Sequence, residues 1–506
     1  MLLKRFIVFA TGVLLALPAF AQYKEAVEQP EEDKVVLTLE DALKIALSEN
    51  TSVKVADLEI QRQEYARKGS YGSLLPQVSG SGMYSYALKK QKVYFGSDKQ
   101  SDDGEGSSGG GMAGMMAALM NPIYYYIEQL YAGTGVPYVP YVDPGSSQEG
   151  SSSSSEPMEM GRSHSVTLGL SAQMPLVNFQ LWESLRLSGD QVELAVEQAR
   201  ESRLGTVASV KQAYYAILFA KEAYNVYNSV FENAVENYRL TEMRYNAAKA
   251  SELDLTRAKA NVAAAIPNLY NAENSVELAL WQLKAVMGID LDRNIDVAGS
   301  LEEYAGQMFS DIAEGEQASL EGNTTLRQLA QQAEMMARQI RMQQYAYLPS
   351  LSLTFSYSYL TQSDIFNLSQ WKWFPSSTIG VSLSIPIFSG GQRYHAVKQV
   401  RVQADELDLQ RENTERQLRI GIRQSLGTMD TAMRTYDASK EALASAEKAY
   451  DIAVKSYQLG KSTLTDLNNT ELTLTQSKLA VSQAIYNFVI AKAGLEQTLG
   501  YDFNEN

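Results

Sequence analysis

A short motif that occurs twice constrains the fold of this chain more than any other feature of its sequence. Residues 457–467 read YQLGKSTLTDL, and 212 residues earlier residues 245–255 read YNAAKASELDL. Gly288 and Gly500 keep the same spacing of 212 residues. Each copy of the motif is a turn between two long helical patterns. The sequence therefore predicts an internal duplication of one helix-turn-helix unit.

Apolar residues recur at steps of three and four on both sides of each turn. Before the first turn two such series run side by side, starting at Ala213 and Tyr214. Sustained heptads predict coiled-coil packing, and two adjacent series predict neighbouring helices on two sides. About 70 residues precede the turn, which corresponds to a helix of about 100 Å at 1.5 Å per residue. Pro267 is expected to interrupt and kink the return helix of the first half.

Four shorter stretches alternate apolar with small polar residues, at 78–88, 166–174, 351–359 and 379–385. A period of two predicts β-strands, and four strands is the predicted count for the whole chain. One apolar and one small-polar face is typical of an outer-membrane barrel, although an ordinary sheet lying on helices would alternate in the same way. The flanking helical segments are too long to fold back over the strands, which favours the barrel. Because closure needs about eight strands, several chains must contribute.

The N-terminus has the three parts of a secretory signal peptide over residues 1–21. Lys4 and Arg5 are basic, an apolar run follows, and Ala21 ends a small-residue cleavage site, so the mature chain is expected to begin at Gln22. No later stretch is apolar over the roughly 20 residues of a spanning helix. Any insertion into a membrane is therefore expected to use β-strands.

Composition excludes several classes of function. The sequence has no cysteine, so disulfides, thiolate metal sites and lipid-anchored cysteines are absent. A formal charge of −15 argues against a nucleic-acid partner. The two histidines, His164 and His395, belong to no metal-spaced or triad-like pattern, and no phosphate-binding loop is present. We predict a chain that is no enzyme and has no cofactor and no metal, so that any step that needs energy must draw it from a partner.

A long insertion, residues 96–161, separates the first two predicted strands. Pro76 and Pro175 are 99 residues apart, whereas Pro349 and Pro386 are 37 apart, so the first half carries 62 extra residues. The ends of the insertion are rich in Gly and Ser. Its middle holds a group of methionines: Met112, Met115, Met116 and Met120. We expect a mobile surface loop with a small self-packed patch; a soft Cu(I) site is the alternative.

Three segments resemble the TolC-like outer-membrane efflux proteins, also called outer membrane factors. They are LTLEDALKIALSEN at residues 37–50, the strand-to-helix junction IPIFSGG at 385–391, and the turn at 457–467. The first-half junction, MPLVNFQLW at 174–182, lacks the glycine pair. The resemblance implies an α + β membrane protein built as a homotrimer, with four strands per chain in a 12-stranded β-barrel continued by a long α-helical coiled-coil barrel. It also implies a Gram-negative outer membrane location, with the helical part in the periplasm.

The resemblance divides the chain into successive segments. They are a signal peptide at 1–21, N-terminal periplasmic helices at 22–72, the first strand pair at 73–175 with its inserted loop 96–161, the first helix-turn-helix at 176–287, an equatorial segment at 288–322, a helix at 323–347, the second strand pair at 348–386, the second helix-turn-helix at 387–499 and a tail at 500–506.

Carboxylates just past the second-half turn form the periplasmic entrance in this family, and the resemblance assigns that position to Asp466. Three symmetry-related carboxylates would favour cations and repel one another. Residues 463–466 also read as a helix capping box, which is the alternative role, and Asp254 repeats both possibilities in the first half. Asn469 stands where the family often has a second carboxylate, so a doubled acidic ring is not expected.

Further residues are assigned around the turns and near the second strand pair. Tyr457 and Tyr245 could hydrogen-bond across helices to hold the entrance shut, with core packing as the alternative for Tyr457. The candidate contacts of a periplasmic adaptor are Ala248, Lys249, Ala250, Gly460, Lys461 and Ser462. The candidate aromatic girdle at the lipid interface is Tyr359, Trp371, Trp373 and Phe374, with loop packing as the alternative.

These observations predict a passive exit duct in the outer membrane that completes a tripartite efflux or export system. An adaptor protein would dock at the helical tips and link the duct to an inner-membrane pump. Two alternatives remain, the exit channel of type I protein secretion and a non-channel periplasmic coiled-coil scaffold. The sequence does not distinguish small molecules from polypeptides as the exported substrate.

Overall fold

The computed structural model describes residues 35–93, 158–308 and 319–501. They divide into a helical unit, which takes the described residues up to 70, 182–346 and 388 onward, and a strand unit, which takes 71–181 and 347–387. The predicted signal peptide, most of the insertion at 96–161 and the last residues of the tail lie outside the described residues.

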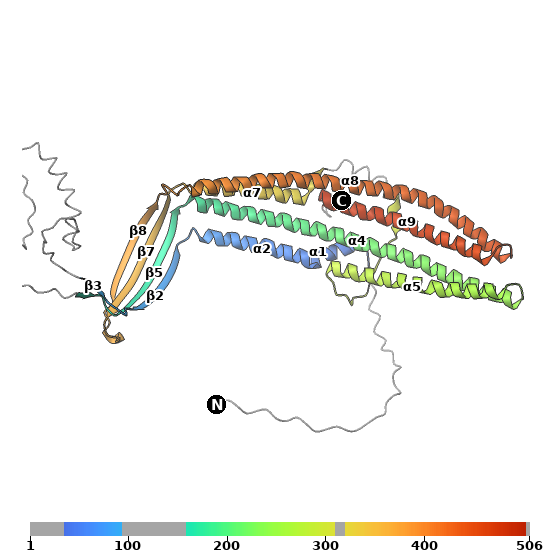
Figure 1. The fold of residues 1–506 in the computed structure, drawn as a ribbon, viewed down its shortest axis with the longest axis horizontal. Coiled ribbons are helices and arrows are strands. Elements are labelled where there is room, and N and C mark those ends of the chain that lie inside the picture. The colour runs from blue at the N-terminus through green and yellow to red at the C-terminus, as the bar shows by residue number, and fades with distance from the viewer. Residues whose placement is uncertain (1–34, 94–157, 309–318, 502–506) are drawn as a thin grey trace, which may run out of the picture. The chain divides into compact units, whose positions relative to one another are not determined.

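The helical unit contains two helical hairpins of closely similar dimensions (Figure 1). The helices that precede the turns have 68 and 67 residues, and both return helices have 36. The hairpins are α4 (Phe179–Asn246) with α5 (Glu252–Met287), and α8 (Gln392–Gln458) with α9 (Leu464–Leu499); the shorter helices are α1 (Leu39–Glu49), α2 (Thr51–Gly72) and α7 (Thr324–Tyr345). At 1.5 Å per residue, α4 is about 100 Å long. The predicted duplication of long helix, turn and return helix is confirmed.

The return helix α5 is continuous through Pro267. The expectation that this proline interrupts the helix was wrong. Ala258, Ala265 and Ala272 are all buried at steps of seven residues on both sides of the proline. Because this seam packs along its whole length, tertiary contacts outweigh the one backbone hydrogen bond that proline removes.

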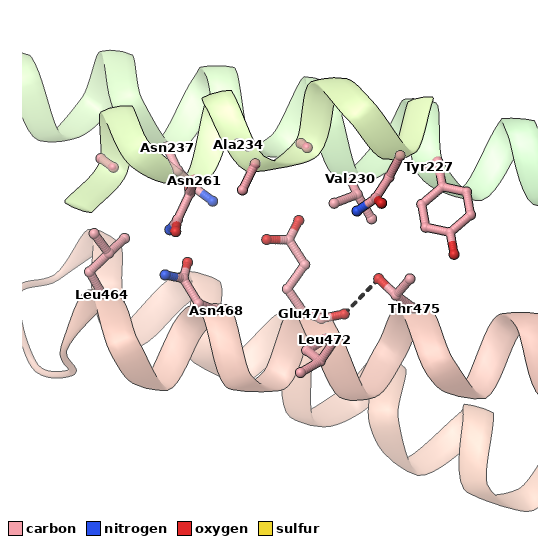
Figure 2. Close-up of a pocket in the computed structure, with 14 residues that line it drawn as sticks. Tyr227, Val230, Ala234, Asn237, Asn261, Leu464, Asn468, Glu471, Leu472 and Thr475 are labelled. Atoms are coloured by element: carbon pink, nitrogen blue, oxygen red, sulfur yellow. Dashed lines mark hydrogen bonds between the residues drawn. The ribbon is translucent and has the colours of Figure 1, made fainter. Parts of the chain in front are cut away.

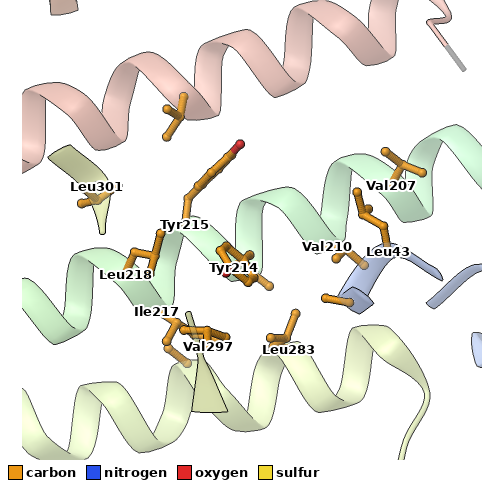
Figure 3. Close-up of a cluster of buried hydrophobic side chains, with 14 of the residues drawn as sticks. Leu43, Val207, Val210, Tyr214, Tyr215, Ile217, Leu218, Leu283, Val297 and Leu301 are labelled. Atoms are coloured by element: carbon orange, nitrogen blue, oxygen red, sulfur yellow. The ribbon is translucent and has the colours of Figure 1, made fainter. Parts of the chain in front are cut away.

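The core of the helical unit joins elements from both halves of the sequence. Figure 3 shows Leu43 of α1, Val210 and Ile217 of α4, and Leu283 of α5 packed together. Side chains of α9, among them Phe488, belong to the same buried cluster. Burying a side chain of this size contributes about 2 kcal/mol. The two hairpins are therefore held together at this level by one shared apolar core.

A two-stranded parallel sheet crosses this core and was not expected from the sequence. Strand β1 (Val35–Leu37) pairs with β6 (Ile295–Val297), and the 3-10 helices η1 (Leu301–Gln307) and η2 (Leu320–Gly322) follow in the equatorial segment. The hydroxyl of Tyr214 donates to the carbonyl of Ala298 at 2.6 Å, which ties α4 to this segment. The expected count of four strands was therefore too low.

An asparagine performs the same structural task in each half. The Asn50 side chain donates to the Val286 carbonyl at 2.6 Å, and the Asn323 side chain donates to the Thr498 carbonyl at 2.6 Å. The amide oxygen of each asparagine accepts a backbone N–H from the first turn of the helix that follows. Each asparagine thus bridges the end of a return helix to the start of α2 or α7.

The glycines that end the return helices are required by close backbone contact. Gly288 and Gly500 adopt left-handed conformations, with φ of 76° and 77°. A Cβ atom on Gly288 would lie 2.8 Å from the Glu49 carbonyl oxygen, and one on Gly500 would lie 2.1 Å from the Gly322 carbonyl oxygen. Only glycine can therefore occupy these two positions without displacing the neighbouring backbone.

The strand unit contains one antiparallel sheet in the order β2-β5-β7-β8 (Figure 1). Its members are β2 (Gln77–Tyr86), β5 (His164–Val177), β7 (Ser350–Ser363) and β8 (Phe374–Ser384), and the short strands β3 (Gln91–Val93) and β4 (Met158–Met160) form a separate pair. The four long strands coincide with the four predicted ones. Strand β4 shows that the predicted loop 96–161 ends in a short strand.

The register of the sheet gives it one apolar and one polar face. Leu170 pairs with Gly80 and with Tyr357, whereas the next residue, Ser171, pairs with Ser79 and Ser356. The hydroxyls of Ser79 and Ser171 share a hydrogen bond of 2.8 Å on the polar face.

In the single chain both faces are open. On the apolar face Ile379 is 72% exposed and Val381 is 65% exposed. An ordinary sheet lying on helices would bury one face, so this alternative is wrong for the chain by itself. No helix in the described ranges is both long enough and apolar enough to cross a bilayer.

Candidate functional site at the helical tips

The two turns at the helical tips have the same backbone conformation but different residues. Ala248 and Gly460 occupy equivalent positions and are both left-handed, with φ of 56° and 71°. The following amides close the same hydrogen bond, Lys249 to the Arg244 carbonyl and Lys461 to the Ser456 carbonyl, each at 2.8 Å. Ala248 is the one non-glycine residue of the described chain with positive φ. The first turn is therefore strained where the second is relaxed.

Capping boxes begin both return helices. The Thr463 hydroxyl donates to Asp466 Oδ2 at 2.6 Å, and the Ser251 hydroxyl donates to Asp254 Oδ2 at 2.7 Å. Hydrogen bonds from the hydroxyl and backbone of Thr463 lower the pKa of Asp466. The capping role predicted as an alternative is confirmed for both aspartates. Asp466 and Asn469 are exposed on α9, and their predicted place at an entrance stays a prediction.

Tyr457 lies at the centre of a contact between the two hairpins. It is 6% exposed, and its hydroxyl shares a 2.6 Å hydrogen bond with Thr241 Oγ1 of α4. The Arg244 guanidinium lies 4.7 Å from the centre of the Tyr457 ring and also donates to the Gln458 carbonyl. Cation–π and hydrogen-bond contacts therefore tie the tip of α4 to the tip of α8. Tyr245, the first-half counterpart of Tyr457, is 39% exposed.

Sequence reasoning missed Thr241 and Arg244 as partners of Tyr457. The signal was present, because the heptad series that includes Ala234 continues to Asn237 and Thr241 at steps of three and four. These are the first polar residues on an otherwise apolar seam. Thr241 is completely buried, and a buried hydroxyl needs a hydrogen-bond partner.

A small apolar cluster surrounds Tyr457 and anchors the second tip. Ala258 of α5, Ala453 of α8, and Leu464 and Leu467 of α9 pack with it. Leu467 has no exposed surface. Tyr457 therefore packs in an apolar cluster and also hydrogen-bonds to a neighbouring helix.

The candidate adaptor contacts lie at the surface of the turns. Ala248, Lys249, Gly460 and Lys461 are exposed, and Ala250 and Ser462 are half-buried. Leu459 beside them is 71% exposed. The tips therefore present small, apolar and basic groups to solvent.

The candidate girdle residues separate into different groups in the strand unit. The rings of Tyr359 and Trp373 are 6.4 Å apart, and Trp371 packs edge-on to Phe366 at 5.7 Å. Phe374 pairs with Leu360, one residue out of phase with Tyr359, so the register puts it on the polar face. The structure thus brings Tyr359 and Trp373 together but does not bring Phe374 to the same side of the sheet.

Tyr84, Tyr86 and His164 are three further aromatic residues on the apolar face, and they were not predicted as a group from the sequence. Tyr84 and Tyr86 lie near His164, whose ring is 4.9 Å from Tyr86 and 5.4 Å from Phe366. The Tyr84 hydroxyl shares a 2.8 Å hydrogen bond with His164 Nδ1. His164 is therefore part of an aromatic cluster, and within the described ranges no three His, Cys, Asp or Glu side chains are grouped to hold a metal.

A sheet open on both faces, together with a duplicated pair of long helical hairpins, defines the class of outer-membrane channel proteins. The sequence profile described as outer membrane efflux protein matches residues 130–289 and 316–501. This is more than half of the 506 residues, and the chain belongs to the outer membrane efflux protein family.

Individual proteins show the same similarity. The outer membrane protein TolC of Escherichia coli K12 is 23% identical over 352 residues, which is 67% of this chain and 70% of that protein. The alkaline protease secretion protein AprF of Pseudomonas aeruginosa is 22% identical over 341 residues, 64% of this chain and 68% of that protein. The solved structure of the CmeC outer membrane channel of Campylobacter jejuni has a TM-score of 0.62 at 18% identity and covers 91% of this chain and 85% of that one.

The family and its members confirm the predicted class and location. The chain is an outer-membrane export channel of the TolC type, found in the outer membrane of Gram-negative bacteria. Its family is one of channels and not of enzymes.

Proposed function

We propose that three copies of this chain form the exit duct of a tripartite export system. The carrying observation is the four-stranded sheet with two open faces, since three such sheets supply twelve strands, enough to close a barrel. Exposed apolar side chains on α8 support the same assembly, because Val402 is 54% exposed, Leu409 67% and Ile420 66%. A neighbouring copy of the chain would cover such a surface.

The entrance of the duct is proposed to lie at the helical tips and to be held shut by Tyr457. Its contacts with Thr241 and Arg244 join the second-half hairpin to the first-half hairpin. Opening by outward movement of the second-half hairpin would have to break these contacts. Asp466 would line the entrance while capping α9, since the capping bonds use one of its two carboxylate oxygens.

The exposed turns at residues 247–250 and 459–462 are proposed as the docking surface of a periplasmic adaptor protein. The adaptor would link the duct to an inner-membrane pump, which would supply the energy for export. No catalytic step is proposed for the chain itself. On the strand unit, Tyr359, Trp371 and Trp373, together with Tyr84 and Tyr86, are proposed to lie at the lipid interface.

Export of polypeptides is a second candidate function. It is supported by the similarity to AprF, which is named as a protease secretion protein. Export of small molecules is supported by the family description, which is that of efflux proteins. Both candidates use the same duct and differ in the pump partner, so identification of proteins cross-linked to the turns would separate them.

Single-channel recording tests the proposed gate. The double substitution Tyr457→Phe with Thr241→Val removes the hydroxyl pair and retains the bulk of both side chains. We expect a conductance several times that of the unsubstituted channel in a planar bilayer, because the tips are released from each other. Tyr270→Phe is the matched control, since Tyr270 is 64% exposed on α5. Equal conductance in all three proteins would refute the gate at Tyr457.

The assembly has its own test. Detergent extraction should give a trimer that resists heating in mild denaturant. A monomer recovered from the periplasm without detergent would instead support the coiled-coil scaffold.

A further inference from the structure

A pocket of about 280 Å³ lies between the first-half hairpin and α9, close to the tips (Figure 2). Much of its wall is apolar and comes from both hairpins. The apolar lining includes Val230, Ala234, Ala265, Leu464 and Leu472. Small-molecule sites in proteins are commonly of this kind, apolar with a few convergent polar groups.

One carboxyl group, that of Glu471, projects into this pocket (Figure 2). Glu471 is 9% exposed, and its Oε1 atom has no hydrogen-bond partner. Burial raises the pKa of Glu471, while hydrogen bonds from the Asn233 amide and the Tyr450 hydroxyl oppose the rise. A buried carboxylate oxygen without a partner is costly, so the site is incomplete as the chain stands.

Within the part of the chain that the structure describes, the pocket wall supplies no cation to pair with Glu471. None of the 14 residues that line the pocket is Lys or Arg. The first-half position equivalent to Glu471, 212 residues earlier, is the exposed Lys259. The acid is therefore not part of the packing that the duplication repeats. It belongs to the second half alone.

Amide side chains line the pocket beside Glu471. Asn237, Asn261 and Asn468 extend toward the same space from α4, α5 and α9 (Figure 2). An amide oxygen accepts hydrogen bonds, as a carboxylate does, and an ammonium group has three donors. The pocket thus combines several acceptors with one acid and an apolar wall.

We propose that this pocket binds a small organic cation, a protonated amine with an apolar body. The ammonium group would donate to Glu471 and to the amide oxygens of Asn261 and Asn468. The apolar body would lie against Val230 and Leu472. A metal ion fits less well, because the site offers one carboxylate and a largely apolar wall. The site stands independently of the channel assignment, since its occupancy is measured by binding and not by transport.

Calorimetric titration of the detergent-solubilised full chain with n-butylamine at pH 7.5 tests this site. n-Butanol is the neutral match of equal length. We expect saturable binding of the amine and at least 10-fold weaker binding of the alcohol. Glu471→Gln should weaken amine binding at least 10-fold, because the amide has no charge. The matched control is Glu277→Gln on the exposed face of α5, which should bind the amine normally.

A second variant separates loss of the site from loss of folding. Ala264→Leu puts a larger side chain into the pocket and leaves Glu471 in place. We expect it to abolish amine binding while the thermal unfolding measured by circular dichroism stays unchanged. The proposal would be overturned by equal affinities for amine and alcohol, or by unchanged binding in Glu471→Gln. It would also be overturned if calcium chloride bound in a Glu471-dependent manner and the amine did not.

Discussion

The two helical tips share a scaffold, but equivalent tyrosines make different contacts in the two halves. Both turns have a left-handed residue and both return helices begin with a capping box. Tyr457 is buried against α4, however, whereas Tyr245 is 39% exposed. The difference teaches that the duplication preserved how each helix starts and stops. The buried tyrosine that joins the hairpins, and on which the proposed gate depends, is Tyr457 of the second half.

The largest difference between the tips should appear when the two tyrosines are removed. Tyr457→Ala leaves a cavity and removes the hydrogen bond with Thr241, whose hydroxyl keeps only its bond to the Asn237 carbonyl, so we expect a loss of about 3 kcal/mol in the local opening free energy of the second tip. Tyr245→Ala should cost less than about 1 kcal/mol, because Tyr245 is 39% exposed where Tyr457 is 6% exposed. Hydrogen exchange of the tip amides measures both. Equal effects would mean that the two tips are equivalent in energy.

An intermediate effect is expected from exchanging the left-handed residues of the turns. Gly460→Ala should destabilise the second tip by about 1 kcal/mol, because it introduces the strain that Ala248 already carries. Ala248→Gly should relieve that strain and be close to neutral, since glycine also gains entropy in the unfolded chain. Protease sensitivity of the turns reports both changes. If Gly460→Ala is silent, the left-handed strain inferred for the first turn is absent.

The caps should behave alike, which makes them the internal reference for the comparison. Thr463→Ala and Ser251→Ala should each cost about 1 kcal/mol in the opening free energy of their own return helix. Amide exchange in the first turns of α9 and α5 measures the two losses. Losses that differed strongly between the halves would show that the caps, too, have diverged.

The smallest effect should be a pH dependence linked to the cap of α9. Thr463 lowers the pKa of Asp466, so the stabilisation is present above the ordinary carboxyl pKa of about 3.9 and is lost as the pH falls through the lowered value. Thr463→Ala should therefore remove this acid sensitivity. Amide exchange at the start of α9, followed from pH 5 to pH 2, measures it. An unchanged profile in the variant would show that Thr463 does not hold the carboxylate.

The sequence predicted the parts of this structure that repeat over many residues. Heptads located the long helices, and alternation located the four long strands. Strand β1 was not predicted, because it has only three residues and pairs with β6, about 260 residues away. No local period in the sequence reveals such a strand. Tertiary packing kept α5 continuous through Pro267, against its local preference.

The site was predicted less completely than the fold. The capping by Asp466 and Asp254 was predicted because it follows from residue types at fixed offsets, and the packing of Tyr457 follows from the heptad pattern, whereas their roles at an entrance stay predictions. Thr241 was missed because its partner comes from the other half of the chain. Phe374 was assigned to the girdle by residue type alone, and only the strand register shows that it faces the polar side.

The asparagine bridges have a mechanical consequence for the entrance. Asn323 ties the end of α9 to the start of α7, far along the helix from the turn at Gly460. A helix of 36 residues is about 54 Å long, so once the Tyr457 contacts at the tip break in the proposed opening, α9 would act as a lever held near Asn323. A tilt of about 5° at the held end would move the tip by about 5 Å at that helix length. If the proposed adaptor docks at the turns, it would therefore need to tilt the second-half hairpin only slightly to widen the proposed entrance.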